Sequence, residues 1–199
     1  MSSHLESAAT EGRDLIDLAR LAVREAVANK RLPEAIPQQG VFSEHRGVFV
    51  TLHVRGALRG CIGVVEAQRP LGESIVQSAI SAAMHDPRFA SVRADELEAM
   101  QVEVSLLSVP ITVRPDEVEI GKHGLLIISG DRRGLLLPQV ATEHGLNREQ
   151  FLDETCRKAG LPRGSWRSAG VDIFGFTCEI FSEFADGQVA YWRACADEK

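Results

Sequence analysis

The chain has 199 residues, of which 44% are hydrophobic and 25% are charged. This is the composition of an ordinary globular protein that is long enough to bury a sizeable core. Asp and Glu number 28 against 22 Lys and Arg, so the formal net charge is −6, and a negative surface disfavours binding to the phosphate backbone of nucleic acids. No stretch approaches the roughly 20 apolar residues of a membrane-spanning helix. We therefore expect neither a nucleic acid nor a membrane as partner.

Cysteine usage indicates the compartment. The four cysteines are scattered and form neither a Cys-x-x-Cys pair nor the Cys/His spacing of a zinc site: Cys61, Cys156, Cys178 and Cys195. No basic head followed by an apolar run opens the chain, so no signal peptide can be recognised. These features predict a cytoplasmic protein with reduced thiols, without a disulfide scaffold or a metal site. The sequence leaves the question of a cofactor open.

The first predicted elements are a tail and a helix. Residues 1–11 are small and polar, and we expect them to form a flexible tail. From residue 14 to residue 29, apolar side chains recur with helical spacing on a wide stripe, which predicts a helix that is buried over much of its circumference. Pro33 and Pro37 then mark a loop.

Two alternating strands follow, over residues 48–54 and 58–64. Joined by a three-residue loop at residues 55–57, they pair Val54 with Leu58, Leu52 with Gly60, Val50 with Ile62 and Val48 with Val64 on one face, and Thr51 with Cys61 and His53 with Arg59 on the other. A two-residue turn would instead place Arg59 on the apolar face, where a buried charge is costly. We therefore expect the three-residue loop.

The remaining elements alternate between helices and strands. In chain order they are a helix over residues 70–84, a long strand over 101–113, a hairpin with strands at 124–129 and 135–137, a short helix over 138–144, a helix over 147–159 and a final strand over 172–184. Asn147 can cap the helix over residues 147–159, and Gln150, three residues later, can complete a capping box. Hairpins mixed with helices indicate an α+β fold with a mixed, largely antiparallel sheet and flanking helices.

Cys61 is the first candidate for chemistry. Two glycines flank it, Gly60 among them, and glycine in a strand lets another backbone or a ligand come close. A neighbouring cation such as Arg59 lowers the pKa of a thiol, and His53 or His85 could act as its base. The alternative is that Cys61 is a small buried hydrophobe, as free cysteines usually are.

Two further polar groups are candidates. His85, Asp86 and Arg88 lie just past a helix end, where they could bind an anion or form an acid/base pair, or simply satisfy the helix terminus and a turn. Glu103 and Ser105 share one face of their strand. This face either lines a cleft together with Cys61, which would make Glu103 a candidate base or ligand, or it faces water. The candidate substrate-binding residues are therefore Thr51, Arg59, Gly60, Asp86, Arg88, Glu103 and Ser105.

The hexapeptide Leu58-Arg59-Gly60-Cys61-Ile62-Gly63 resembles the signature of the AMMECR domain family, whose prokaryotic members are also called AmmeMemoRadiSam system protein A. Further matching segments are Asp86-Pro87-Arg88-Phe89, the strand through Val104-Ser105 to Pro110, Gly134-Leu135-Leu136-Leu137-Pro138-Gln139-Val140, and Phe151-Leu152 through Cys156 to Lys158-Ala159-Gly160-Leu161. The resemblance spans roughly residues 14–184.

This resemblance implies one domain over residues 12–195, with a larger lobe, a smaller accessory lobe and a cleft around the hexapeptide. It brings no settled activity, but it suggests a Memo-like protein and a radical S-adenosylmethionine protein as partners. Two hypotheses are open. The protein is an accessory or binding module without chemistry of its own, or an enzyme with Cys61 as nucleophile and a nearby histidine as base.

Overall fold

The computed structural model describes residues 2–66, 68–184 and 186–193. It divides into two compact units. The first unit comprises residues 1–106 and 179–192, and the second comprises residues 107–178 and 193–199, in each case as far as the structure describes them. Residues 194 and 195, the end of the predicted domain, lie outside the described residues, and so does Cys195. Helices and strands mix in both units, so the predicted α+β fold is confirmed.

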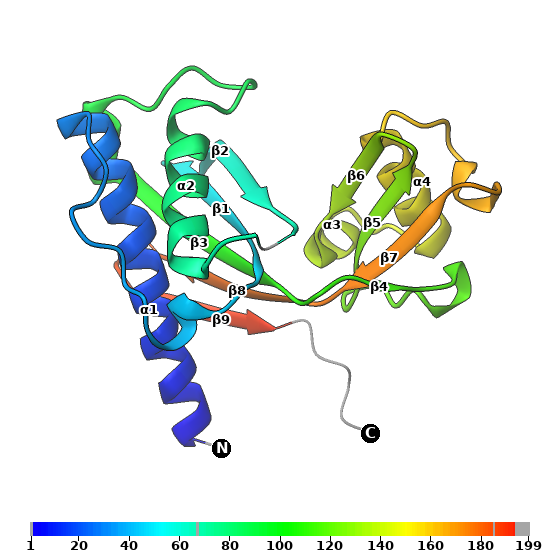
Figure 1. Ribbon diagram of the computed structural model, residues 1–199, viewed down its shortest axis with the longest axis horizontal. Helices are drawn as coiled ribbons and strands as arrows, with labels where there is room; N and C mark the ends of the chain where they lie inside the picture. The colour runs from blue at the N-terminus through cyan, green and yellow to red at the C-terminus, as the bar shows by residue number, and fades with distance from the viewer. Residues whose placement is uncertain (1, 67, 185, 194–199) are drawn as a thin grey trace. The chain divides into compact units, whose positions relative to one another are not determined.

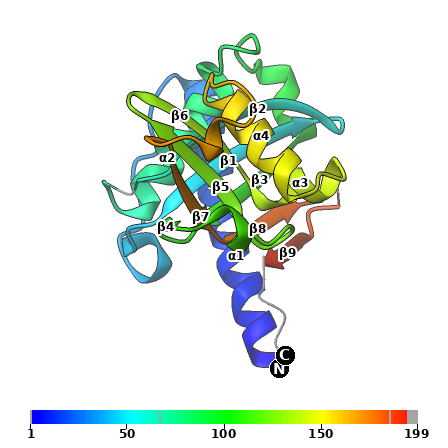
Figure 2. The same ribbon diagram turned by 90° about the vertical axis from the view of Figure 1, so that its right-hand side faces the viewer.

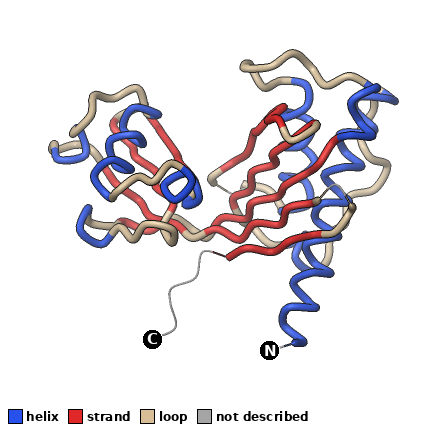
Figure 3. Tube along the Cα trace, turned by 180° about the vertical axis from the view of Figure 1, so that it is seen from behind, coloured by secondary structure: helices blue, strands red, loops and turns tan. Residues whose placement is uncertain are grey.

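The first unit is a sheet with helices on one face. The strand order is β2-β1-β3-β8-β9, with β1 at Gly47–Val54, β2 at Ala57–Val64, β3 at Met100–Leu107, β8 at Cys178–Glu183 and β9 at Val189–Arg193. The helices α1 (Ser2–Arg24) and α2 (Leu71–Met84) lie in front of this sheet in Figure 1 and behind it in Figure 3, so both cover the same face. Their apolar sides and the inward residues of the strands form one core, which includes Leu15, Ile16, Val50, Leu52, Ile75 and Val104.

The first helix begins earlier than predicted. The helix expected over residues 14–29 is present, as α1 followed by a π-helical turn at Glu25–Asn29. It starts at Ser2, so the predicted flexible tail is helical from that residue on. Gly12 explains part of the difference, because a Cβ atom there would lie 2.3 Å from the ring of Phe181 in β8. Helix and sheet are already in close contact two residues before the predicted start.

The β1–β2 hairpin corrects the predicted loop. The turn has two residues, Arg55 and Gly56, both with positive φ (53° and 78°), as in a type I′ turn. The pairs nearest the turn are Val54 with Ala57 and His53 with Leu58, and a bulge then restores the predicted register from Leu52–Gly60 through Thr51–Cys61 to Val48–Val64. Arg59 is the extra residue of this bulge. The predicted pairing of His53 with Arg59 is therefore wrong, and the pairing of Thr51 with Cys61 is confirmed.

Two predicted strands turn out to be two strands each. The strand expected over residues 101–113 comprises β3 in the first sheet and β4 (Ile111–Thr112) in the second, and the strand expected over 172–184 comprises β7 (Asp172–Phe176) and β8. The chain passes from one sheet to the other at Ser108 and Thr177, where the Ser108 N–H donates to the Thr177 carbonyl (3.0 Å) and the Thr177 N–H to the Ser108 hydroxyl (2.9 Å). An alternating pattern does not reveal such a transfer, because the backbone stays extended through it.

The second unit has a sheet of order β4-β7-β5-β6, with β5 at Gly124–Ser129 and β6 at Arg132–Leu136. The helices are α3 (Pro138–Glu143) and α4 (Arg148–Lys158), both shown in yellow in Figure 2. Asn147 and Gln150 form the predicted capping box at the start of α4, with hydrogen bonds of 2.9 and 3.0 Å. A Cβ atom on Gly134 would lie 2.3 Å from the Ala159 nitrogen, so this glycine allows the end of α4 to pack directly on β6.

Within the described part of the chain, none of the helices combines the length and the apolar character that crossing a bilayer requires.

Candidate functional site

Cys61 lies in β2, which is an edge strand of the first sheet. Its side chain is on the face turned away from α2, because the preceding residue, Gly60, faces that helix. A Cβ atom on Gly60 would lie 2.0 Å from the carbonyl oxygen of Ala82 in α2. We predicted Gly60 as a substrate-binding residue; in the structure its missing side chain allows the helix backbone to touch the strand.

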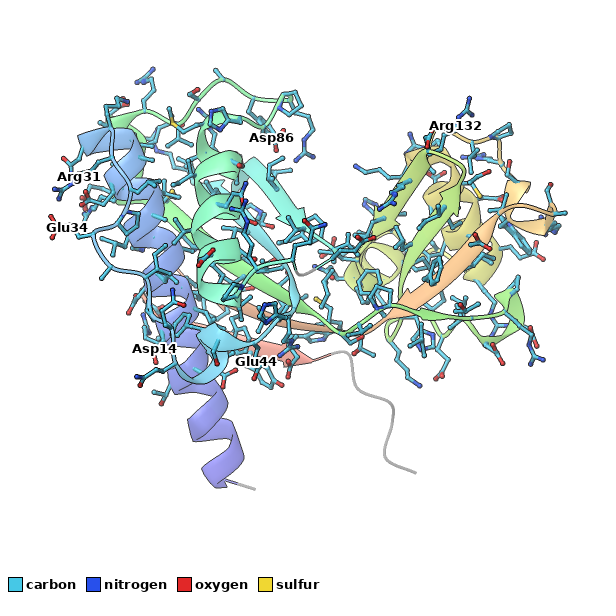
Figure 4. The ribbon with its side chains drawn as sticks, viewed as in Figure 1. Asp14, Arg31, Glu34, Glu44, Asp86 and Arg132 are labelled. Atoms are coloured by element: carbon cyan, nitrogen blue, oxygen red, sulfur yellow. The ribbon has the colours of Figure 1, made fainter. Side chains whose placement is uncertain are left out.

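Asp86 and Arg88 occupy the open edge of β2 at Cys61. The Cys61 N–H donates a 2.9 Å hydrogen bond to Oδ2 of Asp86, and Nη2 of Arg88 donates to the Cys61 carbonyl at 3.3 Å. Arg88 also binds the Asp86 carboxylate through Nη2 (2.7 Å) and Nε (3.0 Å), and its main-chain N–H donates to Oδ1 at 3.1 Å. Asp86 is labelled in Figure 4 just beyond the end of α2. The pair thus binds both main-chain polar groups of Cys61, as a further strand would.

This arrangement determines the charge of Asp86. The carboxylate is almost fully buried, with 1% of its side chain exposed, yet it accepts hydrogen bonds from Arg88 and from the Cys61 N–H. The Arg88 guanidinium, foremost, and these N–H donors hold the pKa of Asp86 far below its usual range. Asp86 is therefore a permanently charged anchor and cannot act as an acid or base near neutral pH.

The Cys61 thiol is not activated. Burial raises its pKa above the ordinary value, and the nearby carboxylates of Glu103 and Asp86 act in the same direction. The Thr51 hydroxyl, which donates to the sulfur at 3.3 Å, and the charge of Arg88 act against this and do not prevail. The thiol is therefore protonated at neutral pH.

Arg59 is not the cation that acts on the Cys61 thiol, contrary to prediction. It forms a two-point ion pair with Glu96, with Nε–Oε1 at 2.8 Å and Nη2–Oε2 at 3.1 Å, and it also donates to the carbonyls of Ala90 and Ser91. The cation whose charge acts to lower the pKa of Cys61 is Arg88, which the sequence placed among the candidate substrate-binding residues. The bulge distinguishes Arg59 from its expected setting, because it leaves this residue without the predicted partner His53 in β1.

The two histidines proposed as bases lie in different settings. His53 is half-buried in β1 opposite Leu58. His85 is exposed at the C-terminal end of α2, where its main-chain N–H donates to the Ser81 carbonyl at 2.8 Å. Among the described residues, neither imidazole forms a hydrogen bond with Cys61.

A polar sheet face surrounds Cys61. We use this name for Thr51, Cys61, Glu103, Ser105 and Ser182, which come from β1, β2, β3 and β8. Glu103 accepts a 2.6 Å hydrogen bond from the Ser182 hydroxyl. Ser105 is fully buried, and its hydroxyl has no hydrogen-bond partner among the described residues. Within the same residues, no group of three or more His, Cys, Asp or Glu side chains is placed to hold a metal ion.

Sequence reasoning found four of these five residues and missed Ser182. Its partner Glu103 is 79 residues away in the chain, and no local pattern links the two. The bonds from Asp86 and Arg88 to Cys61 were missed for the same reason. The only available signal was that both segments belonged to the motifs of the same resemblance.

The chain is similar to known proteins over most of its length. A family model described as AMMECR1 matches residues 16–181. The chain belongs to the AMMECR1 family. Relatives of this AMMECR1-family chain include a protein of Methanothermobacter thermautotrophicus, 44% identical over 87% of the chain and 94% of the relative, and one of Thermococcus kodakarensis, 45% identical over 86% and 90%.

A solved structure also shows the fold. The crystal structure of an uncharacterized protein from Pyrococcus horikoshii is similar to this AMMECR1-family chain, with a TM-score of 0.85 and 38% sequence identity over 92% of the chain and 96% of the other protein. The resemblance inferred from the sequence motifs is therefore confirmed. In this member the hexapeptide lies within β2, and Asp86 and Arg88 of the Asp-Pro-Arg-Phe segment bind the main chain of Cys61 at the edge of that strand.

Proposed function

We propose that this AMMECR1-family protein is a binding module that presents the polar sheet face to a ligand or partner, and that Cys61 is a binding residue instead of a nucleophile. The observation that carries this proposal is the state of the thiol. Burial raises its pKa, and its side-chain hydrogen-bond partner is the neutral hydroxyl of Thr51. A catalytic cysteine needs the opposite arrangement, with a base or cation that favours the thiolate.

The surroundings of Cys61 support binding in two ways. The main chain of Cys61 is held by Asp86 and Arg88, so the position of its side chain is fixed before any ligand arrives, which reduces the entropy lost on binding. Glu103 and Ser182 are only half-buried on the same face, so the carboxylate and the hydroxyl that donates to it are within reach of a ligand.

The partners that we propose are the Memo-like protein and the radical S-adenosylmethionine protein that the AMMECR resemblance suggests. The setting that we propose is the cytoplasm, which suits the free thiols of Cys61 and Cys156. Both statements rest on the resemblance and on cysteine usage.

The first test measures the alkylation rate of each cysteine in the native protein between about pH 5 and pH 11 by peptide mass spectrometry. We expect Cys61 to react slowly, with a midpoint above the value of about 8.5 for a free thiol. The fully buried Cys156 serves as an internal control for unfolding. Fast reaction of Cys61 alone, with a midpoint below 7, would overturn the proposal in favour of a nucleophile.

The second test measures binding of the two partner proteins by titration calorimetry. Glu103→Gln removes the charge of the half-buried carboxylate on the polar sheet face and should weaken binding about tenfold, while Glu98→Gln, the same change at an exposed residue outside this face, should leave it unchanged. Absence of binding to either partner protein would refute the choice of partners. Binding that is unaffected by Glu103→Gln would refute the choice of surface.

A further inference from the structure

The second unit carries a groove that the proposed function does not use. It consists of two adjoining hollows that share Leu146 and Glu154, with volumes of about 450 Å³ and 160 Å³. The larger hollow has an apolar floor made by Leu136 at the end of β6, Val140 in α3 and Leu146 in the loop before α4. The lining of the larger hollow comes from β6, α3, the loop before α4 and α4 itself, and Figure 2 shows these two helices on the side of the second unit that faces the viewer.

The floor of the groove is the uncovered edge of the second core. Leu136, Val140 and Leu146 pack against the buried cluster around Phe151 and Leu152 but remain half-buried themselves. Two of them belong to the segment Gly134–Val140, a matched motif of the chain. Pro138 begins α3 directly after β6, so the chain reverses there and brings Val140 to the same hollow as Leu136.

The rim of the groove is positively charged. The Glu154 carboxylate is shared by two guanidiniums, with Nε of Arg157 and Nη2 of Arg163 each 2.7 Å from one of its oxygens. The side chain of Lys158 forms no ion pair or hydrogen bond with the described residues. The lining of the two hollows therefore carries three cations against two carboxylates, Glu154 and Asp153, in a chain whose formal net charge is −6. Arg157 and Lys158 lie in the last turn of α4, where cations also interact favourably with the negative end of the helix dipole. Arg163 lies beyond the helix and reaches back to bind Glu154.

We propose that this groove binds an acidic segment of a partner polypeptide, which inserts a bulky aliphatic side chain over Leu136 and Val140 and places neighbouring carboxylates against Lys158 and Arg157. The apolar floor selects the aliphatic anchor, and the excess of cations selects the acidic neighbours. The second hollow, which reaches Arg163, extends the site beyond the space for one side chain, so the groove fits a run of residues.

The test selects peptides from a phage-displayed library of random dodecapeptides on the full-length protein. We expect the enriched peptides to share a bulky aliphatic residue next to Asp or Glu. Fluorescence anisotropy on a synthetic copy then measures affinity for three variants. Lys158→Glu should weaken binding about tenfold, Val140→Ala about threefold, and Lys30→Glu, the same charge reversal on an exposed lysine of the first unit, should leave it unchanged.

Added salt should weaken the same complex, because its charged contacts lie at an exposed rim. Enriched peptides without acidic residues, or with equal affinity for the protein and Lys158→Glu, would overturn the proposal. Occupation of the groove by a second copy of this chain would also overturn the proposal. Sedimentation would then detect a dimer, and Val140→Ala would weaken that dimer. None of these variants touches the polar sheet face, so the result is separate from the test of the proposed function.

Discussion

The main-chain N–H of Cys61 donates a 2.9 Å hydrogen bond to Oδ2 of Asp86, a residue 25 positions further along the chain. This bond joins the hexapeptide to the Asp-Pro-Arg-Phe segment, and Arg88 adds a second bond by donating to the Cys61 carbonyl. Because β2 is an edge strand, these two side chains form the hydrogen bonds that a neighbouring strand would otherwise form. The two motifs therefore form one structural unit around the cysteine.

Asp86→Asn should lower the free energy of unfolding by about 2 kcal/mol at neutral pH, because it removes the charge from buried hydrogen bonds. The matched control is Asp95→Asn, which removes an exposed ion pair with Arg93 at the same two-residue spacing and should change stability far less, because solvent screens the pair. Urea unfolding measures both. Equal effects of the two substitutions would contradict a special role for Asp86.

The contribution of Asp86 should depend on pH. The folded state lowers its pKa, so its stabilisation is present above the unfolded-state value of about 3.9 and is lost as the pH falls below it. The difference in unfolding free energy between the native chain and Asp86→Asn should therefore shrink below about pH 4. A difference that grows on acidification would have the wrong sign for this account.

Gly60→Ala should destabilise the protein by about 3 kcal/mol or prevent folding, because the added Cβ would lie 2.0 Å from the Ala82 carbonyl oxygen. Gly56→Ala provides the comparison. Gly56 has a positive φ but open space around it, so alanine there incurs only backbone strain of about 1 kcal/mol. Thermal unfolding should rank Gly60→Ala well below Gly56→Ala, and the reverse order would show that α2 moves aside easily.

Arg55→Asn should stabilise the protein by about 0.5 to 1 kcal/mol. Arg55 has φ 53° and precedes Gly56 in a two-residue type I′ turn, for which Asn-Gly is the preferred sequence. Arg55→Ala, which tolerates positive φ no better than arginine, is the control and should show no gain. Urea unfolding measures the change. A loss of stability with Arg55→Asn would indicate that contacts of the arginine side chain stabilise the fold by more than the relief of backbone strain does.

Thr51→Val should raise the pKa of the Cys61 thiol further, since it removes the hydrogen bond that the hydroxyl donates to the sulfur and that favours the thiolate. Thr51→Ser keeps the hydroxyl and should leave the pKa near its native value. The pH midpoint of Cys61 alkylation measures the shift. A lower midpoint in Thr51→Val would show that the hydroxyl accepts from the thiol.

Local patterns in the sequence predicted the helices and much of the hairpin register. The capping box at Asn147 and the pairing of Thr51 with Cys61 depend on neighbouring residues and on alternation, and both are present in the structure. The residue types of the candidate site were visible too, because Cys61, Asp86, Arg88 and Glu103 lie in short motifs.

Tertiary structure alone decided how those residues act on each other. Arg59 lies in a bulge and binds Glu96, so the cation beside Cys61 is Arg88, and the strand around Ser108 passes to another sheet without any break in its alternation. A bulge, an edge-strand contact and a change of sheet each depend on which distant segments meet. Periodicity reports only which way neighbouring side chains face, so it could predict the elements but not the partners of their polar groups.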